Sequence, residues 1–416
     1  MLQSHLFTKT RKTPPKDEVS KNAQLLIRAG FIDKLHAGVY SYLPLGLAVL
    51  KRIEQVIREE LNAVGAQELL MPALQPKEPW VATGRWDALD VLYKVRDSSG
   101  KEYALGPTHE EVIVPLVRQF LSSYEDLPFS AYQFQTKFRM ELRSKSGILR
   151  GREFLMKDQY SFHRDEQDLD TYYEQMQGVY RKIFERVGIG GQTFLTFASG
   201  GSFSKYSHEF QTLTDSGEDT IYLCRACRLA VNDEIWPEVG YCPECQKTTL
   251  EKKKAIEVGN IFKLGTKYTE PFAVTYKDRA GEDQLVVMGC FGIGLGRVMG
   301  AVAEIFSDDA GLVWPAAIAP YDVHLVGLFA RADEAVVKRA LGVYEQLERA
   351  GIRVLSDDRQ DVQAGEKLAD ADLLGIPVRL VVSSKTGERV EWKERTAKKM
   401  ELLSVQEIIG RFLVTK

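Results

Sequence analysis

Apolar residues recur at three- and four-residue steps in two N-terminal segments of the chain. The first segment has them at Leu25, Leu26 and Ile27, and the second at Leu50, Ile53, Val56, Ile57 and Leu61. This spacing is typical of amphipathic helices. A Leu-Pro-Leu-Gly break at residues 43–46 precedes the second helix, because proline is tolerated only at the first turn of a helix.

Strand-like apolar runs follow, each bounded by polar turns. They cover residues 68–71, 92–95, 103–105, 131–138 and 154–162. Since they are not separated by regular helices, a mostly antiparallel sheet edged by helices fits better than repeated βαβ units. The larger part of the chain is therefore predicted to be an α+β domain.

The pattern changes after the Pro-containing linker at residues 314–320. Strands are predicted at 323–329, 353–356 and 378–383, and helices at 333–349 and 366–374. This alternation predicts a small C-terminal α/β domain over residues 320–416.

Composition and length narrow the class of protein. A 416-residue chain with 44% apolar and 27% charged residues is typical of a soluble protein of two or more domains. No apolar stretch is long enough for a membrane span, and the basic, Pro-containing N-terminus lacks the pattern of a signal peptide. We therefore expect a cytoplasmic protein without membrane contact. The net charge of −3 neither supports nor excludes a nucleic-acid partner.

Four of the five cysteines form two Cys-x2-Cys pairs, Cys224 with Cys227 and Cys242 with Cys245. This spacing is typical of tetrahedral zinc bound by four thiolates. Four free buried thiols are the alternative. Because four thiolates leave no position for water, a structural Zn²⁺ in a small zinc-ribbon-like module, inserted at residues 223–254, is predicted.

A basic loop lies between two of the predicted strands. Arg139 and Glu141 precede it, Arg143, Lys145 and Arg150 lie in it, and Phe154 follows it. An arginine on a strand can bind a carboxylate and a phosphate with its planar fork, mobile cations suit further phosphates, and an aromatic ring can stack on a base. The alternative is an ordinary solvated loop.

Glycines alternate along the strand that ends at Arg297, at Gly292, Gly294 and Gly296. They would let a ligand approach the backbone closely, and Arg297 could cover the other face of an adenine. The alternative is a flat strand packed under a helix. The pattern is not a dinucleotide-binding fingerprint, since Arg297 stands where the third glycine would be, and no phosphate-binding P-loop motif occurs in the sequence.

These two segments together resemble motifs 2 and 3 of class II aminoacyl-tRNA synthetases. Motif 1, a helix followed by a strand ending in proline, matches residues 54–63 and 65–72. In that class motif 1 forms the dimer interface, so the resemblance implies a homodimer. It also implies ATP with Mg²⁺ as substrate, an antiparallel sheet flanked by helices at 1–222 and 255–314, and an anticodon-binding domain at 320–416.

Thr108 and Glu110 match the Thr-x-Glu loop that binds the imino nitrogen in prolyl-tRNA synthetases. Thr108 and Glu111 also have the spacing of a helix capping box. Both readings can hold. The resemblance to this family, in its bacterial-type form, runs nearly end to end. Segments that carry it lie at 38–46, 150–154, 156–163, 207–210, 256–259, 264–268, 314–315, 357–359, 365–367 and 370–377.

By this resemblance the chain activates L-proline with ATP and transfers it to tRNA(Pro). Arg139 would bind the prolyl carboxylate and the α-phosphate, and Phe162 and His163 would lie near the pyrrolidine ring. Arg139 and Arg297 would be catalytic, and the ATP site would contain Arg139, Glu141, Arg150, Phe154, Glu209, Gly292, Gly294 and Arg297. Arg359 and Lys367 would contact the anticodon.

The sequence departs from the family pattern in three respects. Residues 200–209 carry extra positions, including 202–204, and Asn260 and Phe291 replace the family's usual His and Tyr. A large editing domain that many bacterial relatives carry between motifs 2 and 3 is replaced by the four-cysteine module. We therefore expect no editing of alanine in cis, and either a separate trans-editing protein or tolerance of errors.

Two other functions remain open from the sequence. The chain could be a synthetase-like protein that binds tRNA or an amino acid without charging. The presence of Thr108, Glu110, Arg139, Phe154 and Arg297 disfavours this. It could also be a class II synthetase for another amino acid, which the Thr-x-Glu loop and the C-terminal segments disfavour.

Overall fold

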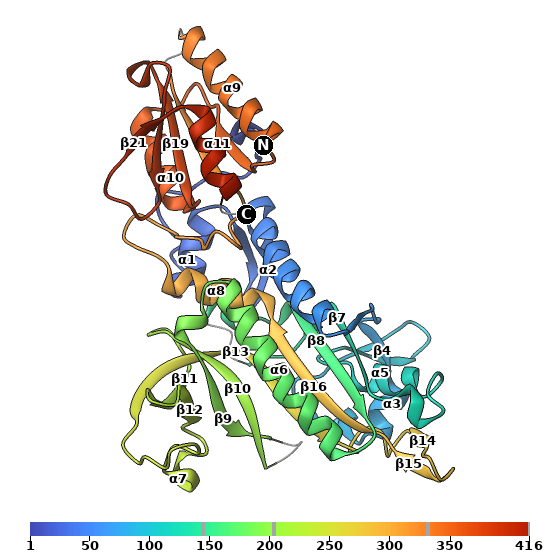
Figure 1. Cartoon of the computed structure of the whole chain (residues 1–416). Coiled ribbons are helices and arrows are strands. Elements are labelled where there is room, and N and C mark those ends of the chain that lie inside the picture. The colour runs from blue at the N-terminus through green and yellow to red at the C-terminus, as the bar shows by residue number, and fades with distance from the viewer. Residues whose placement is uncertain (143–145, 202–204, 330–332, 415–416) are drawn as a thin grey trace. The chain divides into compact units, whose positions relative to one another are not determined.

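The computed structural model describes residues 1–142, 146–201, 205–329 and 333–414 (Figure 1). The predicted phosphate-binding residues Arg143 and Lys145, and residues 202–204 of the lengthened segment, lie outside this part. The chain divides into two compact units. The core unit contains Leu35–Tyr40 and Ile53–Ala301, and the terminal unit contains Met1–Lys34, Ser41–Arg52 and Val302–Lys416.

The core unit is built on a nine-stranded sheet with the order β10-β9-β12-β11-β13-β16-β8-β7-β3. Its strands are β3 (Gln67–Glu68), β7 (Phe129–Phe138), β8 (Glu153–His163), β9 (Thr193–Ser199), β10 (Tyr206–Leu213), β11 (Asp219–Cys224), β12 (Leu229–Asn232), β13 (Glu251–Gly265) and β16 (Val287–Gly294). All pairings are antiparallel except β12 with β9 and β3 with β7. The predicted antiparallel sheet is therefore confirmed.

One face of this sheet is covered by α6 (Glu166–Arg186), which runs along β8, β13 and β16 (Figure 1). The helix begins at its N-cap Asp165, whose carboxylate accepts the backbone N–H of Asp168. Its apolar stripe of Leu169, Tyr173, Met176, Tyr180 and Phe184 is buried. Because α6 occupies this face, the residues that project from the opposite face of β8 and β16 are the ones that can line a ligand site.

Smaller elements complete the core unit. A three-stranded sheet has the order β4-β6-β5 and packs around Trp80 and Trp86. The remaining elements are β4 (Leu74–Pro76), α3 (Lys77–Ala82), α4 (Arg85–Ala88), β5 (Tyr93–Arg96), β6 (Glu102–Leu105), α5 (Glu110–Val117), α7 (Trp236–Val239), β14 (Thr275–Lys277) and β15 (Asp283–Leu285). Four elements include residues of both units: β1 (Ile32–His36), β2 (Val39–Tyr42), α2 (Pro44–Ala63) and α8 (Leu295–Ile305).

The four-cysteine module is less separate than the sequence suggested. Its strands β11 and β12 belong to the nine-stranded sheet, where β12 also pairs with β9. Strand β13 pairs with β11 through Glu251 to Ala255 and then with β16 from Gly259 onward. One continuous strand therefore joins the cysteine module to the centre of the sheet, because backbone hydrogen bonds favour extending an existing strand edge.

The terminal unit contains a five-stranded sheet with the order β18-β17-β19-β20-β21. Its elements are α1 (Lys21–Arg28), β17 (Val323–Leu328), α9 (Glu334–Arg349), β18 (Val354–Asp357), α10 (Ala364–Leu374), β19 (Val378–Ser383), β20 (Val390–Glu394), β21 (Glu401–Leu403) and α11 (Val405–Val414). The predicted strands and helices are confirmed to within two residues. The antiparallel strands β20 and β21 and the helix α11 were not predicted.

The first ten residues of the chain belong to the terminal unit and contact its C-terminal α/β part. Leu2 forms a parallel bridge with Ser356, and Thr10 Oγ1 donates to Asp370 at 2.6 Å. The sequence placed residues 1–222 together in the catalytic domain. It gave no sign of these contacts because they join residues more than 350 positions apart.

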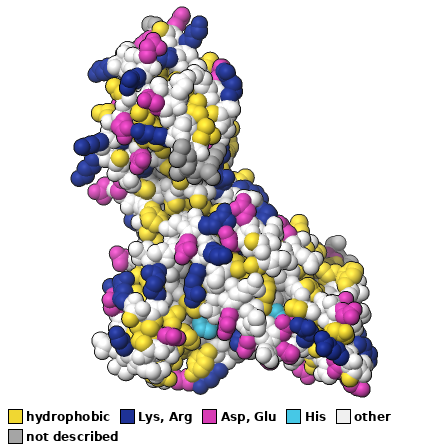
Figure 2. Space-filling model, in the orientation of Figure 1, with side chains coloured by type: hydrophobic (Ala, Val, Ile, Leu, Met, Phe, Trp, Pro, Cys, Tyr) yellow, Lys and Arg dark blue, Asp and Glu magenta, His cyan; other side chains and the backbone are white. Residues whose placement is uncertain are grey.

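Charges of both signs are interspersed on the face drawn in Figure 2, over both units. This distribution agrees with a net charge close to zero. Among the described residues no helix has the length and apolar character needed to cross a membrane.

Candidate nucleotide and amino-acid site

A β-hairpin holds Arg139 at the edge of the site. Strands β7 and β8 pair without interruption from Phe129 opposite Phe162 to Phe138 opposite Glu153. The backbone N–H of Arg139 then donates to the carbonyl oxygen of Arg152 at 2.8 Å, which extends the hairpin by one residue. The guanidinium group is therefore fixed to a rigid part of the sheet.

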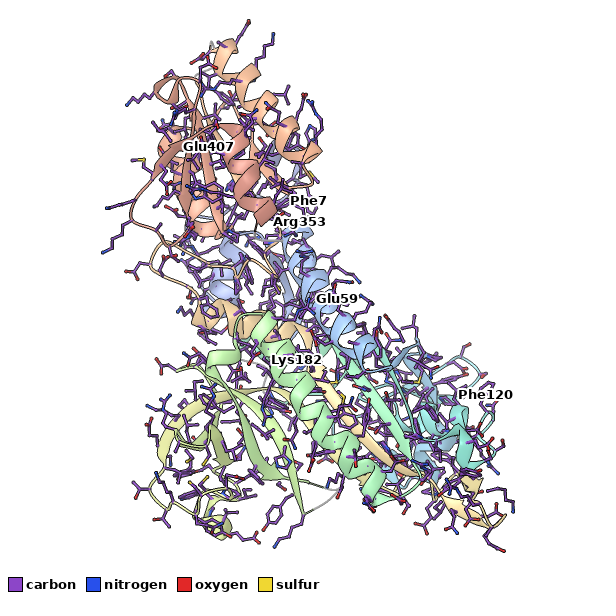
Figure 3. The ribbon with its side chains drawn as sticks, viewed as in Figure 1. Phe7, Glu59, Phe120, Lys182, Arg353 and Glu407 are labelled. Atoms are coloured by element: carbon purple, nitrogen blue, oxygen red, sulfur yellow. The ribbon has the colours of Figure 1, made fainter. Side chains whose placement is uncertain are left out.

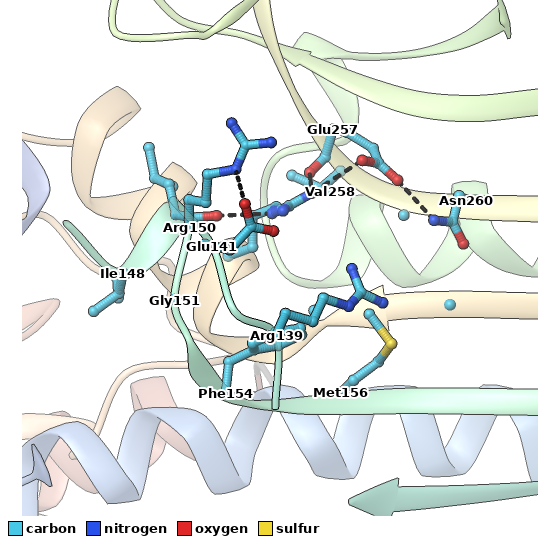
Figure 4. Close-up of a pocket in the computed structure, with 15 residues that line it drawn as sticks. Arg139, Glu141, Ile148, Arg150, Gly151, Phe154, Met156, Glu257, Val258 and Asn260 are labelled. Carbon is cyan, nitrogen blue, oxygen red and sulfur yellow. Dashed lines mark hydrogen bonds and ion pairs between the residues drawn. The ribbon is translucent and has the colours of Figure 1, made fainter. Parts of the chain in front are cut away.

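Residues from motifs 2 and 3 and from strand β13 surround a single cavity (Figure 4). It is lined by Arg139, Glu141, Ile148, Leu149, Arg150, Gly151, Phe154, Met156, Glu257, Val258, Gly259, Asn260, Gly292, Gly294 and Arg297. Of the eight residues predicted to form the ATP site, seven line this cavity. Glu209 is the exception.

Arg139 is weakly held by the protein. Its Nε and Nη2 atoms both lie 3.4 Å from the carbonyl oxygen of Pro107, at the long end of the hydrogen-bond range. The guanidinium group also lies 5.3 Å from the ring centroid of Phe154. Burial and the neighbouring Arg297 lower the pKa of Arg139. Arg139 is therefore a partly buried cation with no carboxylate bonded to it among the described residues.

Arg297, in contrast, is firmly oriented. Its Nε donates to the carbonyl oxygen of Leu149 at 2.9 Å, and its Nη1 donates to the carbonyl oxygen and to Oε2 of Glu257, both at 3.0 Å. Asn260 Nδ2 in turn donates to Glu257 Oε1 at 2.8 Å. Motifs 2 and 3 and strand β13 are thus joined through one guanidinium group.

Gly292 lies against Asn260 in the wall of the cavity. A Cβ atom on Gly292 would lie 2.8 Å from Oδ1 of Asn260, so a side chain at this position would displace Asn260. Close approach of a ligand to this backbone, expected from the alternating glycines, stays a prediction.

The basic side chain of Arg150 is paired with acidic residues at the mouth of the cavity. Its Nε lies 3.3 Å from Glu141 Oε2 and its Nη1 lies 2.7 Å from Glu218 Oε2. Because these pairs are partly exposed, they are weak, and a polyphosphate could replace the carboxylates. The function predicted for Glu141 and Arg150 fits this position.

Glu209 lies next to the cavity without lining it. Its Oε2 accepts hydrogen bonds from Gln211 at 2.9 Å and Asn232 at 3.3 Å. Burial, with the nearby Glu257, raises its pKa to about 8. Contact between Glu209 and ATP therefore stays a prediction.

Thr108 and Glu110 lie beside Arg139, which contacts the carbonyl oxygen of Pro107. Thr108 Oγ1 donates to Glu110 Oε2 at 2.5 Å, and Cys290 Sγ lies 3.6 Å from Glu110 Oε1. The predicted capping box is wrong: helix α5 begins after the N-cap His109, and no side chain caps it. The Thr108 hydroxyl therefore donates to the carboxylate of Glu110 and does not cap helix α5.

The structure separates Phe162 from His163. Phe162 is fully buried and stacks on Phe129 with ring centroids 4.9 Å apart. His163 points to the other face, where its ring lies 5.3 Å from that of Tyr172 on α6. Since neighbouring residues of a strand project to opposite faces, and Phe154 and Met156 set the face of the cavity, only Phe162 can share a face with the substrate. His163 thus projects away from the cavity, and its place near the pyrrolidine ring stays a prediction.

The four cysteines fit a tetrahedral metal ion. Their Sγ atoms all lie within 4.8 Å of one another, and a Zn–S distance of about 2.3 Å places tetrahedral ligands roughly 3.8 Å apart. The residue after each pair, Arg228 or Gln246, has a positive φ, which turns the backbone around the thiols. The backbone N–H of Lys247 lowers the pKa of Cys245 to about 7.

The two residues predicted to read the anticodon, Lys367 and Arg359, lie in the terminal unit, and Lys367 lines a cavity there. Lys367 lines it with Leu328, Phe329 and residues 360–364. Its ammonium group is buried and donates to the carbonyl oxygen of Gly327 at 2.7 Å. Arg359 is bound to Asp357 at 2.6 Å and Asp370 at 2.9 Å. Both cations are bonded to groups of the protein itself. Their contact with the anticodon stays a prediction, and it would need these bonds to open.

Sequence reasoning missed several residues of the site. Glu257 was noted only as part of a resembling segment, although its carboxylate positions Arg297. Arg85 and Tyr268 were not singled out as site residues at all, yet both lie beside Glu110. Strand alternation gave no signal for Glu257, because an irregularity in the pairing of β10 with β13 brings Glu257 and Asn260 together although they are three positions apart. The other contacts depend on the tertiary fold.

Comparisons with known proteins agree with this geometry. Residues 93–306 match the family model "tRNA synthetase class II core domain (G, H, P, S and T)", and residues 316–414 match "Anticodon binding domain". Proline–tRNA ligase of Geotalea daltonii is 35% identical, with 99% of this chain and 98% of the relative covered. That of Trichlorobacter lovleyi is 32% identical, with 98% and 97% covered. The crystal structure of prolyl-tRNA synthetase from Cryptosporidium parvum complexed with L-proline and AMP has a TM-score of 0.77 at 18% identity, covering 95% of this chain and 74% of that chain.

The fold and the cavity thus define a class II aminoacyl-tRNA synthetase core with an anticodon-binding domain. Within this class, the near full-length relatives show that the chain belongs to the proline–tRNA ligase family. The alignment with the Trichlorobacter relative runs over 565 positions, against 416 residues here. The relative therefore carries a long stretch without counterpart in this chain, which agrees with the predicted lack of a large insertion.

Proposed function

We propose that this protein activates L-proline with ATP, forming prolyl-adenylate and pyrophosphate, and then transfers the prolyl group to tRNA(Pro) in the cytoplasm. The observation that carries the proposal is the convergence of Arg139, Phe154 and Arg297 on one cavity, with Glu110 beside it. Membership of the family supports the choice of amino acid.

The first step is attack of the prolyl carboxylate on the α-phosphate. Arg139, which is held weakly by Pro107, would bind both groups with its fork and stabilise the charge that develops on the phosphate. Arg297 and Phe154 would hold the adenine between them. Mg²⁺ bound to ATP would supply neutralising charge at the phosphates.

The second step is attack of the terminal ribose of tRNA on the adenylate. Neither step needs a covalent enzyme intermediate, so the residues chiefly orient reactants. Glu110 would hold the secondary ammonium group of proline, since a charged donor needs an anionic acceptor in a buried site.

Proline-dependent exchange of labelled pyrophosphate into ATP tests the proposal directly. Exchange that is most efficient with proline supports it. Exchange that is more efficient with a different amino acid would instead assign another class II specificity, and an absence of exchange with any amino acid would leave a binding protein that does not charge tRNA.

We propose a homodimer formed through residues 54–71. The support is the resemblance to motif 1 and the apolar character of this edge. Leu70 and Leu74 are 73% and 51% exposed, next to β3 at the edge of the nine-stranded sheet. Glu59, labelled in Figure 3, lies on the adjoining helix α2. Sedimentation equilibrium giving the mass of a single chain would contradict this.

We infer that the four cysteines hold one structural Zn²⁺. The ion would join the turn between β11 and β12 to the segment before β13. We expect one zinc per chain in protein purified without chelators. Cys242→Ser should lose the zinc and lower the thermal midpoint by several degrees, because β13 loses its anchor at one end. Elemental analysis and calorimetry measure both.

Cys290→Ser is the matched control for zinc content, since Cys290 is distant in sequence and not part of the cluster. It should retain one zinc per chain. Substoichiometric zinc in the unaltered protein would count against the metal, and an unchanged midpoint in Cys242→Ser would remove the structural role.

We also propose that this chain does not edit mischarged alanine, because it lacks the long stretch that its relatives carry. A hydrophobic pocket discriminates only about 10- to 200-fold per methylene. A separate trans-editing protein, or tolerance of errors, would then be needed. Incubation of alanyl-tRNA(Pro) with the purified protein should give only the spontaneous rate of deacylation, and faster release of alanine would refute the proposal.

A further inference from the structure

One guanidinium group bridges two consecutive glutamates beside the cavity. Arg85, the first residue of α4, has its Nη1 atom 3.3 Å from Glu110 Oε2, and 3.0 Å and 3.1 Å from the two carboxylate oxygens of Glu111. Thr83 Oγ1 also donates to Glu111 Oε1 at 2.8 Å. No role follows for Arg85 from the motifs of the family given above.

This cluster is largely removed from solvent. The side chains of Glu110, Glu111 and Arg85 are 3%, 0% and 17% exposed. The guanidinium carbon lies 5.2 Å from the ring centroid of Trp80 and 5.4 Å from that of Tyr268, so two aromatic rings flank the cation. In such surroundings an unpaired charge is strongly destabilising. The charge on each of the three groups therefore depends on the other two.

The hydrogen bonds leave one oxygen of Glu110 for a ligand. Oε2 accepts from Thr108 at 2.5 Å and lies 3.3 Å from Arg85. The only partner of Oε1 among the described residues is the thiol of Cys290 at 3.6 Å, and a thiol is a weak donor. Oε1 is therefore the atom with unused capacity to accept from the secondary ammonium group of proline.

Several other ionisable groups act on this cluster from neighbouring elements. They are His109, Lys137, Arg139, Tyr160, Lys267, Tyr268 and Cys290. Burial, together with Glu110, raises the pKa of Glu111 to about 7, although Arg85 acts in the opposite direction. The carboxylate pair is thus poised to take up a proton if its cation is removed.

We propose that Arg85 is a positioning residue for the imino group of the substrate: it bridges Glu110 and Glu111 and directs Glu110 Oε1 toward the ligand. The proposal rests on the proposed function, because it assumes proline as substrate. When both carboxylates are ionised, they and the guanidinium group carry a net charge of −1, which the ammonium group of proline neutralises. Without Arg85 the pair carries −2 in a buried site, so it takes up a proton or rearranges, and the acceptor is lost.

The test is the Michaelis constant for proline in pyrophosphate exchange. Arg85→Met keeps the volume and removes the charge, and we expect the KM for proline to rise roughly 100-fold. The KM for ATP should change less than about twofold, since Arg85 does not line the ATP cavity. Arg96→Met is the matched control. Arg96 lies in the adjoining small sheet, is 67% exposed and pairs with Glu102, so the proline KM should not change.

A second variant separates charge balance from a structural role. Arg85→Met combined with Glu111→Gln again leaves one carboxylate, Glu110, and a net charge of −1. We expect this double variant to recover at least tenfold of the lost proline affinity. A residue that only supports the fold would not be rescued, because the second substitution removes further contacts.

The pH profile gives a third measurement. Arg85 lowers the pKa of Glu111, so its loss should raise the pKa of the carboxylate pair. The kcat/KM for proline in Arg85→Met should therefore fall more steeply than in the unaltered protein as the pH decreases from about 8.5 to about 6.5, and the double variant should lose this extra dependence.

The inference is overturned if Arg85→Met leaves the proline KM at the value of Arg96→Met. It is also overturned if the KM values for proline and ATP rise together without rescue by Glu111→Gln. A failure of the proposed function is distinguishable from either result, because then the unaltered protein itself would show no proline-dependent exchange.

Discussion

Replacement of Arg139 by alanine is expected to abolish proline-dependent pyrophosphate exchange while the protein stays folded. The guanidinium group is the partly buried cation at the point where the carboxylate and the α-phosphate would meet. Among the described residues, its side-chain hydrogen bonds are two contacts of 3.4 Å to Pro107. Its loss removes charge stabilisation of the transition state, for which a decrease of about 1000-fold or more is the expected scale.

Folding should not depend on Arg139, because it has no carboxylate partner among the described residues and its backbone bond to Arg152 does not involve the side chain. Calorimetry of the variant should therefore give a midpoint close to that of the unaltered protein. Arg139→Lys should also be slow, since an ammonium group lacks the planar fork that binds two oxygens side by side.

Arg164→Ala provides the control. Arg164 lies just past the end of strand β8 that is remote from Arg139. It forms a partly exposed ion pair with Asp168 at 3.3 Å. We expect its exchange rate to stay near that of the unaltered protein. A near-full rate in Arg139→Ala would remove Arg139 from the role assigned to it.

Glu110→Gln is expected to have the second largest effect, a rise of about 100-fold in the KM for proline. Glutamine preserves the shape and the hydrogen bond from Thr108, but it removes the negative charge that would face the ammonium group. A buried cation without an anionic partner is costly. The KM for ATP should change little, because Glu110 does not line the nucleotide cavity. Steady-state exchange kinetics with each substrate varied in turn measure both constants.

The matched control for this variant is Glu102→Gln. Glu102 lies on β6, which precedes the Thr108 loop, and its carboxylate pairs with Lys77 and Arg96 at the surface. The same chemical change should leave both constants unaltered. If Glu110→Gln behaved like Glu102→Gln, the imino group would have to be recognised elsewhere.

Local sequence patterns were sufficient for most of the elements and for the nucleotide side of the site. Arg139, Phe154, Gly292 and Arg297 were predicted from strand and glycine patterns together with the family resemblance, and one cavity joins them. A strand fixes which residues share a face, so residues of one face can meet in one cavity. The same rule, applied to Phe162 and His163, separates His163, which faces Tyr172 of α6.

Contacts between distant segments were not predictable. The bridge from Leu2 to Ser356 joins the two ends of the chain, and the pairing of β12 with β9 merges the cysteine module into the main sheet. Neither is encoded by a local period, because both depend on which strand edges remain available after the rest of the sheet has formed.

The sequence by itself determined the antiparallel core, the α/β tail, the four-thiol cluster and the identity of the residues that resemble motifs 2 and 3. Only the tertiary structure decided the partners of the charged residues beside the nucleotide cavity. Thr108 donates a hydrogen bond to Glu110 and does not cap a helix. Arg85 bridges Glu110 and Glu111. The physical reason is that local spacing fixes the direction of a side chain, whereas the balance of buried charges is set by groups that folding brings together from separate elements.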